Sequence, residues 1–218
     1  TQRQKKRKLL VTLFRSHEEY WKHYQEDNDR EGEHTLGYFV PVPGKEKLSL
    51  YARPGTRSEA VPVLFHEGTH YVLHLANQQV NLPRWVHEGC AEYYGSSLFE
   101  GGRFAPGQVL DGRLLHFQEM IRANKVVPFD RLIRAGNPAR QSEQVPFEGE
   151  HYAQAWAFVH FLYHYKNGKY RAGFAEYLTR WIEGHGVKYE LISGSNQRFI
   201  LPEDDQALLL RCLGHKDF

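Results

Sequence analysis

Two histidines and a glutamate occur at a spacing that can bind and use a metal ion. The chain contains His66-Glu67-Gly68-Thr69-His70 inside an apolar run from Val63 to Leu73. Residues four positions apart lie on the same face of an α-helix, so His66 and His70 can hold one ion between them. Glu67 lies next to the first ligand, and its carboxylate can reach a water bound to that ion. The pattern predicts a zinc site with two protein ligands on one helix.

The segment from Pro83 to Tyr94 can complete this site. The gap between His70 and Glu88 is long enough to end one helix, turn, and start a second helix across from it. Glu88 is then expected to be the third ligand of one zinc ion per chain, with the fourth position left open. Glu92 follows one helical turn later, and it can accept a hydrogen bond from the second ring nitrogen of a ligand histidine. We assign that contact to His66.

Together the two segments resemble the gluzincin zinc peptidases. The resemblance rests on His66-Glu67-x-x-His70 followed by Trp85-x-x-Glu88-Gly89-x-Ala91-Glu92-Tyr93. The second form is most similar to a set of uncharacterised bacterial peptidase-like proteins of that clan. The metzincin pattern does not fit, because it requires glycine at position 73 and histidine at position 76, where this chain has Leu73 and Ala76.

The resemblance implies a zinc peptidase that acts on a peptide or protein substrate. Zinc would activate a water molecule, and Glu67 would take its proton as general base and pass it to the leaving amine. The related proteins carry a tyrosine at a helix start that faces the metal, and Tyr152, followed by Trp156, matches that position. Tyr152 would stabilise the oxyanion together with the metal. Packing of this tyrosine at a helix terminus is the alternative.

A zinc-bearing binding or scaffold module without turnover is the second functional hypothesis. Such a module would use the same three ligands but would have no use for Glu67, so the presence of this residue favours the enzyme. A nucleic-acid binder would depend on the basic cluster from Arg3 to Lys8 alone, without interleaved aromatic residues. We interpret that cluster as a solvated lead-in to the first strand, and we expect no nucleic-acid partner.

Other polar and aromatic residues near the motifs are interpreted as structural. His87 is adjacent to Glu88, and neighbouring helix positions diverge by about 100°, so it should point away from the metal. Cys90 is expected to be a buried free thiol, since two cysteines make no disulfide framework. The remaining residues that we leave out of the ligand set are His74, Trp85, Tyr93, His160 and His164.

The elements that must position these residues predict an α+β fold. Strands are expected at 8–14, 36–42 and 47–52, with Pro41 marking the second as an edge strand. The strand at 47–52 could bind an extended peptide by strand addition. A capping box formed by Ser16 and Glu19 opens a helix between the first two strands.

The rest of the chain is expected to be mainly helical. The motif helix should begin at Ser58 or Val61 and end at Asn77, and Pro83 should start the next helix. A Gly-rich loop is expected from Phe99 to Gly112. Further helices are predicted at 113–124, 129–134, 151–165, 170–183 and 203–213. The resemblance implies a zincin-like arrangement, with a small twisted mixed sheet over the motif helix and a helical lobe after it.

Length and composition fit one domain over 1–218, mainly sheet-forming in 1–60 and mainly helical in 61–218. The 218 residues are 41% hydrophobic and carry a formal net charge of +2, which gives no argument for a polyanionic partner. No apolar run approaches the roughly 20 residues of a membrane span, and no apolar signal region is present. Compartment and oligomeric state are not predicted.

Overall fold

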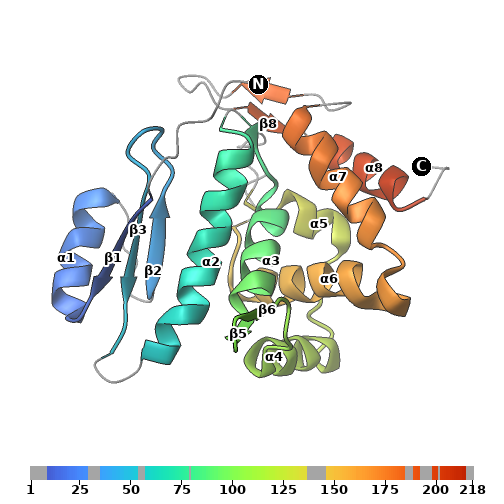
Figure 1. Cartoon of the computed structure of the whole chain (residues 1–218). Helices are drawn as coiled ribbons and strands as arrows, with labels where there is room; N and C mark the ends of the chain where they lie inside the picture. The colour runs from blue at the N-terminus through green and yellow to red at the C-terminus, as the bar shows by residue number, and fades with distance from the viewer. Residues whose placement is uncertain are drawn as a thin grey trace.

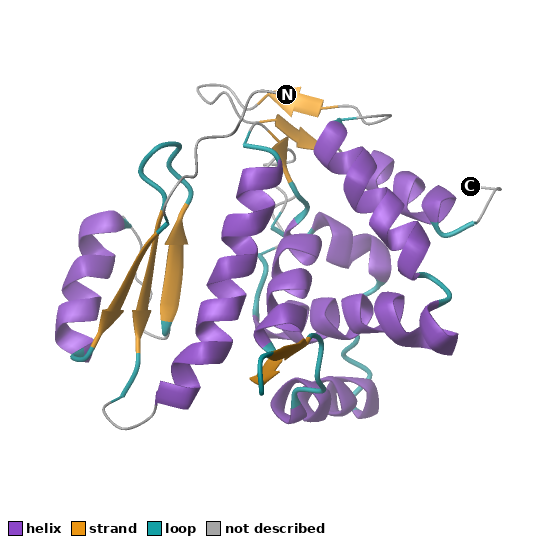
Figure 2. Cartoon of the chain, in the orientation of Figure 1, coloured by secondary structure: helices purple, strands orange, loops and turns teal. Residues whose placement is uncertain are grey.

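The computed structural model describes residues 9–28, 35–53, 57–78, 80–136, 146–184, 189–191, 198–200 and 202–214. It combines many helices with small sheets, which confirms the predicted mixture of helix and strand (Figure 1, Figure 2). The basic cluster from Arg3 to Lys8 lies outside the described residues. No helix in these ranges has both the length and the apolar character needed to cross a membrane.

A mixed three-stranded sheet forms from β1 (Leu10–Phe14), β2 (Gly37–Val40) and β3 (Lys47–Tyr51). The strand order is β1-β3-β2, with β1 parallel and β2 antiparallel to β3. β2 is therefore an edge strand, as Pro41 predicts. The prediction of peptide addition along β3 is wrong, because β3 is the central strand and both of its backbone edges are already paired.

Two helices cover the opposite faces of this sheet (Figure 1). α1 (His17–Asp27) is capped by Ser16, whose side chain accepts a hydrogen bond from the Glu19 backbone N–H, which is one half of the predicted capping box. On its face of the sheet, the fully buried Tyr20 contacts the rings of Tyr38 and Tyr51.

The other face of the sheet packs against α2 (Arg57–Ala76), which carries the histidine motif. A Cβ at Gly37 would lie 2.5 Å from Val63 Cγ1 and 2.9 Å from Leu50 Cδ2. Only glycine allows β2 to approach α2 this closely. The helix begins slightly earlier than predicted, so Pro62 lies inside it rather than in its first turn.

The second motif helix, α3 (Arg84–Gly95), begins directly after Pro83 as predicted and packs along α2. Between them lies the short strand β4 (Val80–Asn81). The helical lobe around α3 contains α4 (Asp111–Arg122), α5 (Phe129–Arg134), α6 (Gly149–Gly168), α7 (Arg171–Glu183) and α8 (Pro202–Cys212). These helices match the predicted ranges closely.

Trp85 lies at the centre of the lobe core and is fully buried. Its ring packs against Phe174 and Tyr177 of α7, and its indole N–H donates to Asp205 of α8 at 3.1 Å. The Tyr177 hydroxyl donates to the same carboxylate. Trp85 therefore joins α3 to the distant C-terminal helix, and its predicted packing role is confirmed.

The first part of the Gly-rich segment after α3 is a hairpin rather than a loop, while residues 106–110 are a loop as predicted. β5 (Leu98–Glu100) pairs with β6 (Arg103–Ala105), and Gly101 and Gly102 between them have φ angles of +57° and +75°. Positive φ at both central residues suits the tight turns that close two-residue hairpins. The remaining strands β7 (Tyr189–Leu191) and β8 (Arg198–Ile200) form a second sheet with β4 in the order β4-β8-β7.

Candidate metal centre

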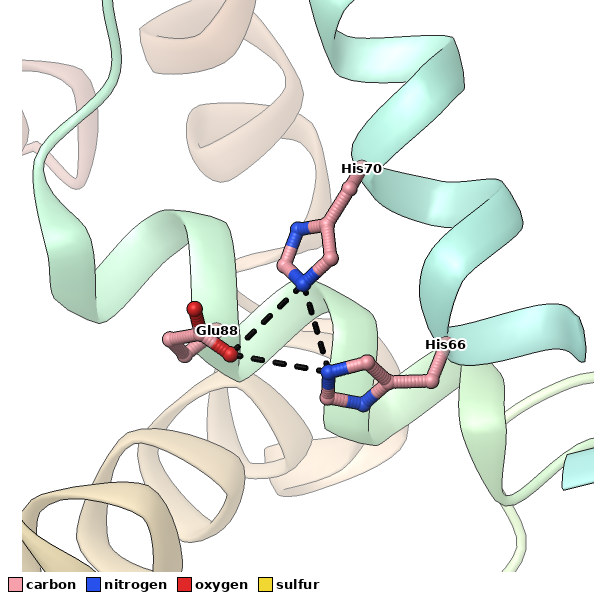
Figure 3. Close-up of side chains that lie close together, drawn as sticks. All are labelled: His66, His70 and Glu88. Carbon is pink, nitrogen blue, oxygen red and sulfur yellow. Dashed lines mark hydrogen bonds and ion pairs between the residues drawn. The ribbon is translucent and has the colours of Figure 1, made fainter. Parts of the chain in front are cut away.

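The structure brings His66, His70 and Glu88 together between α2 and α3 (Figure 3). The two imidazoles project from successive turns of α2, and Glu88 meets them from α3. The Nε2 atoms of His66 and His70 lie 3.2 Å apart. The Oε2 atom of Glu88 lies 3.6 Å from His66 Nε2 and 3.7 Å from His70 Nε2. The predicted ligand set is therefore one compact cluster.

The spacing of the three donor atoms suits zinc. Zinc–ligand bonds of about 2.0–2.1 Å in tetrahedral geometry separate the donors by about 3.3–3.4 Å, close to the distances found here. Two imidazoles and one carboxylate also form the donor set typical of a catalytic zinc site, in which a fourth position stays open. Within the described part of the chain, this is the group of residues whose donor atoms could hold a metal ion.

Arg84 determines which oxygen of Glu88 faces the histidines. Its guanidinium lies one turn before Glu88 on α3 and binds the other carboxylate oxygen, Oε1, at 3.0 Å. Burial opposes ionisation of Glu88, but His66, His70 and Arg84 together lower its pKa to about 2. Glu88 is thus an anion at neutral pH and directs its Oε2 toward the two imidazoles.

Glu67 lies beside this cluster and is 8% exposed. Burial, with the nearby Glu88 carboxylate, raises the pKa of Glu67 to about 7 although His66 and Arg84 oppose the shift. Its Cγ would be 3.1 Å from a Cβ at Gly37, so the side chain lies against the start of β2. A carboxylate with a pKa near neutrality is suited to general base catalysis.

Glu92 faces His66 but has a stronger partner that the sequence analysis missed. Its Oε1 lies 3.9 Å from His66 Nδ1, which is too long for the predicted hydrogen bond. Arg113 of α4 donates to both oxygens of Glu92 instead, at 2.9 and 2.6 Å. This two-pronged contact is a strong charge-assisted ion pair, and it fixes the Glu92 carboxylate next to the candidate ligands.

His87 lies outside the candidate ligand cluster, but it contacts one of its members. Its Nδ1 lies 2.7 Å from Nδ1 of His70. Burial lowers the pKa of His87 to about 4, against the influence of Glu88, so the ring is neutral at pH 7. The α3 helix therefore supplies the candidate ligand Glu88 and, through the preceding residue, a hydrogen-bond partner for His70.

Tyr152 lies in the first turn of α6, at the helix start where the sequence placed it. The Arg113 guanidinium lies 5.8 Å from the centre of its ring, and the nearby Arg84 opposes the rise of its pKa. Burial and the Glu88 charge raise the pKa of Tyr152, so the phenol stays protonated at neutral pH. These contacts place Tyr152 in the polar network that surrounds Glu88.

The other residues left out of the ligand set have structural contacts. Tyr93 is buried and hydrogen-bonds His164 at 2.9 Å, and His160 stacks on His164. His74 lies 3.8 Å from Glu46 and 3.3 Å from Gln78. Cys90 is buried and free, as predicted.

A separate cavity of about 580 Å³ lies along α2, and none of the three candidate ligands lines it. Its walls are largely apolar and include Phe65, Val72 and Cys90. The three candidate ligands therefore lie outside the walls of this cavity.

The sequence analysis missed two arginines of the site, Arg84 and Arg113, and only the first has a local sequence signal. Arg84 precedes Glu88 by four positions, a spacing that predicts an ion pair on a helix. No local pattern marks Arg113, because it reaches Glu92 from another helix.

A family model described as "Protein of unknown function (DUF1570)" matches residues 60–182, more than half of the chain. The match includes both sequence motifs and Tyr152. None of the curated proteins and none of the solved structures gives a match.

Proposed function

The chain belongs to the DUF1570 family, and because that family description names no activity, we propose from the site itself that the protein is a zinc-dependent peptidase of the gluzincin type. The observation that carries the proposal is the triangle of donor atoms from His66, His70 and Glu88, with the buried Glu67 beside it. The small sheet on one side of α2 and the helical lobe on the other support a zincin-like fold.

His66, His70 and Glu88 would hold the zinc ion. When bound, zinc supplies a Lewis acid that makes water reactive near neutral pH and polarises a carbonyl group. Together with His66 and His70, Arg84 lowers the pKa of Glu88, and its contact with Oε1 leaves Oε2 directed toward the histidines. The cluster is also flanked by the Glu67 and Glu92 carboxylates, which favour a cation between them.

Glu67 would act as general base. Its carboxylate is buried beside the first ligand, and its pKa of about 7 balances proton affinity against the need to be ionised. It would take a proton from the attacking water and return it to the amine as the peptide bond breaks. A scaffold that only held zinc would gain nothing from a buried acid with this pKa.

Tyr152 would stabilise the negative charge that develops on the carbonyl oxygen. Arg84 lies near the Tyr152 phenol, and because a guanidinium can only donate hydrogen bonds, the phenol proton would remain free to be donated elsewhere. A donor of this kind strengthens as charge develops in the transition state, and it therefore accelerates the chemical step more than it tightens substrate binding.

The edge strand β2 supports a peptide as the substrate. Within the described residues β2 pairs only with β3, so its second edge is available to an extended chain. Gly37 at the start of β2 lies close to the Glu67 side chain. A peptide bound along this edge would therefore pass next to the proposed base.

The proposal is tested by zinc analysis and peptide-library cleavage on the same purified samples. Wild type should contain one zinc per chain and cleave peptides, while the double variant His66→Ala/His70→Ala should lose both properties. Glu67→Gln should keep zinc and lose about 10²–10⁴-fold in turnover, the usual contribution of a general acid–base group. The same exchange at the exposed Glu119 of α4 is the matched control and should change neither.

Each other outcome has a clear meaning. Stoichiometric zinc in the double histidine variant would refute the metal centre. Unchanged turnover in Glu67→Gln would refute the role of Glu67. Wild type that binds zinc but cleaves no peptide of the library would favour the scaffold module over the peptidase.

A further inference from the structure

The contact between His70 and His87 is a hydrogen bond between two imidazole rings. The two Nδ1 atoms lie 2.7 Å apart, within the range of a hydrogen bond. The ring planes differ by only 16°, and the ring centres are 4.7 Å apart. This short contact joins a candidate ligand on α2 to a residue on α3 that is not itself in the ligand cluster.

A hydrogen bond between two ring nitrogens contains one proton, and its position has a chemical consequence. His70 directs Nε2 toward His66 and Glu88, so metal binding requires the lone pair of Nε2. The proton of a neutral His70 must then be on Nδ1, which donates to His87. The opposite direction would put the proton of His70 on Nε2 and block coordination.

We infer that His87 is a positioning residue that accepts a hydrogen bond from His70 Nδ1–H and thereby fixes the tautomer and orientation in which His70 can bind the metal. This role rests on the proposed metal centre. It also defines His87 itself: its Nδ1 carries the lone pair and its Nε2 carries the proton.

The two candidate histidine ligands are supported differently. His66 Nδ1 is 3.9 Å from Glu92, whose carboxylate is already engaged by both donor groups of Arg113. His70 has a direct partner at 2.7 Å. Outer contacts of this kind typically contribute 10–100-fold to metal affinity. The loss of His87 should therefore weaken zinc binding even though His87 does not touch the metal.

Two substitutions separate the hydrogen bond from the packing of the ring. In His87→Asn, the side-chain oxygen takes a position close to that of Nδ1 and can still accept from His70. In His87→Leu, the acceptor is lost while an apolar group of similar size remains. His160→Leu, in the stacked pair on α6, removes a partly buried histidine outside the ligand cluster and is the control.

Zinc affinity is measured by competition with a chromophoric chelator, and the stability of the metal-free proteins is measured by urea unfolding. His87→Leu should bind zinc about 10–100-fold more weakly, while His87→Asn and His160→Leu stay close to wild type. Similar stability of the metal-free Leu and Asn variants at position 87 would assign the loss to the hydrogen bond. Wild-type affinity in His87→Leu overturns the inference, as does an equal loss of affinity in His87→Asn.

Nitrogen NMR of ¹⁵N-histidine-labelled wild type gives a readout that needs no variant. The expected pattern is a protonated Nδ1 on His70 and an unprotonated Nδ1 on His87. A protonated His87 Nδ1 in the zinc-loaded protein overturns the inference, even if His87→Leu fails to fold. Wild type that binds no zinc refutes the metal centre together with the role of His87, whereas zinc-binding wild type with an unaffected Leu variant refutes only the latter.

Discussion

Replacing Gly89 with alanine should test whether the packing of α3 against α6 positions the candidate ligand Glu88. Gly89 follows Glu88 on α3, where this helix crosses α6. A Cβ at this position would lie 2.8 Å from the Ala155 carbonyl oxygen and 2.8 Å from Val159 Cγ2. The first of these neighbours is backbone, so it cannot move aside as the end of a flexible side chain can. The two helices must separate to accept a single methyl group.

The magnitude follows from two opposing effects. Alanine stabilises a helix interior by about 1 kcal/mol relative to glycine, whereas over-packing a close contact costs about 1–3 kcal/mol. Gly68 provides the matched comparison, because it lies in α2 between the two histidines and no atom outside its own helix and chain neighbours lies within 4 Å of a Cβ there. Both variants gain the same helix propensity, so Gly89→Ala should be about 1–3 kcal/mol less stable than Gly68→Ala.

Urea unfolding of the metal-free variants, followed by circular dichroism, measures this difference. Zinc affinity should also fall in Gly89→Ala, because displacement of α3 moves Glu88 away from the histidines, and it should be unchanged in Gly68→Ala. Equal stability of the two variants would show that α3 and α6 do not approach as closely as the structure has them. Destabilised Gly89→Ala with wild-type zinc affinity would show that Glu88 is positioned independently of this contact.

Three further predictions address other parts of the molecule. Tyr152→Phe should retain zinc and lose about 10²–10³-fold in kcat, as for other oxyanion donors, and a smaller loss would indicate a packing role. Burial raises the pKa of Asp205 to about 6, above its unfolded value of 3.8, so the folded state binds the extra proton between these values. The free energy of unfolding should therefore fall by up to about 3 kcal/mol as pH rises through this window, and in urea titrations Asp205→Asn should lack this component. Burial also raises the pKa of Cys90 to about 12, so a thiol reagent should label Cys212 in the folded protein and reach Cys90 only after unfolding.

The sequence by itself determined the parts of the site that depend on local periodicity. The spacing of His66 and His70 places both side chains on one helix face whatever surrounds that helix. Pro83 sets the start of α3, and Glu88 follows at a distance that lets a second helix lie across from the first. Pro41 likewise marked β2 as an edge strand, because proline has no backbone N–H to donate to a neighbouring strand.

Some features have a local sequence signal that we interpreted incorrectly. The Gly101-Gly102 pair between Glu100 and Arg103 is the turn of a hairpin, and its positive φ angles are what two adjacent glycines permit. A search for two-residue turns would have found it. The position of His87 next to Glu88 led us to expect a side chain pointing away from the site, and it gave no reason to expect the contact with His70.

Only the tertiary structure decided which elements lie side by side. β3 is central because the parallel strand β1 pairs with it from the far side, and strand order depends on a pairing between distant segments that no local pattern determines. Arg113 reaches Glu92 from another helix, and His87 meets His70 only because α3 crosses α2 in one particular register. Local spacing thus fixes the three candidate metal ligands, while the groups that orient those ligands depend on helix packing, which is determined by the whole core.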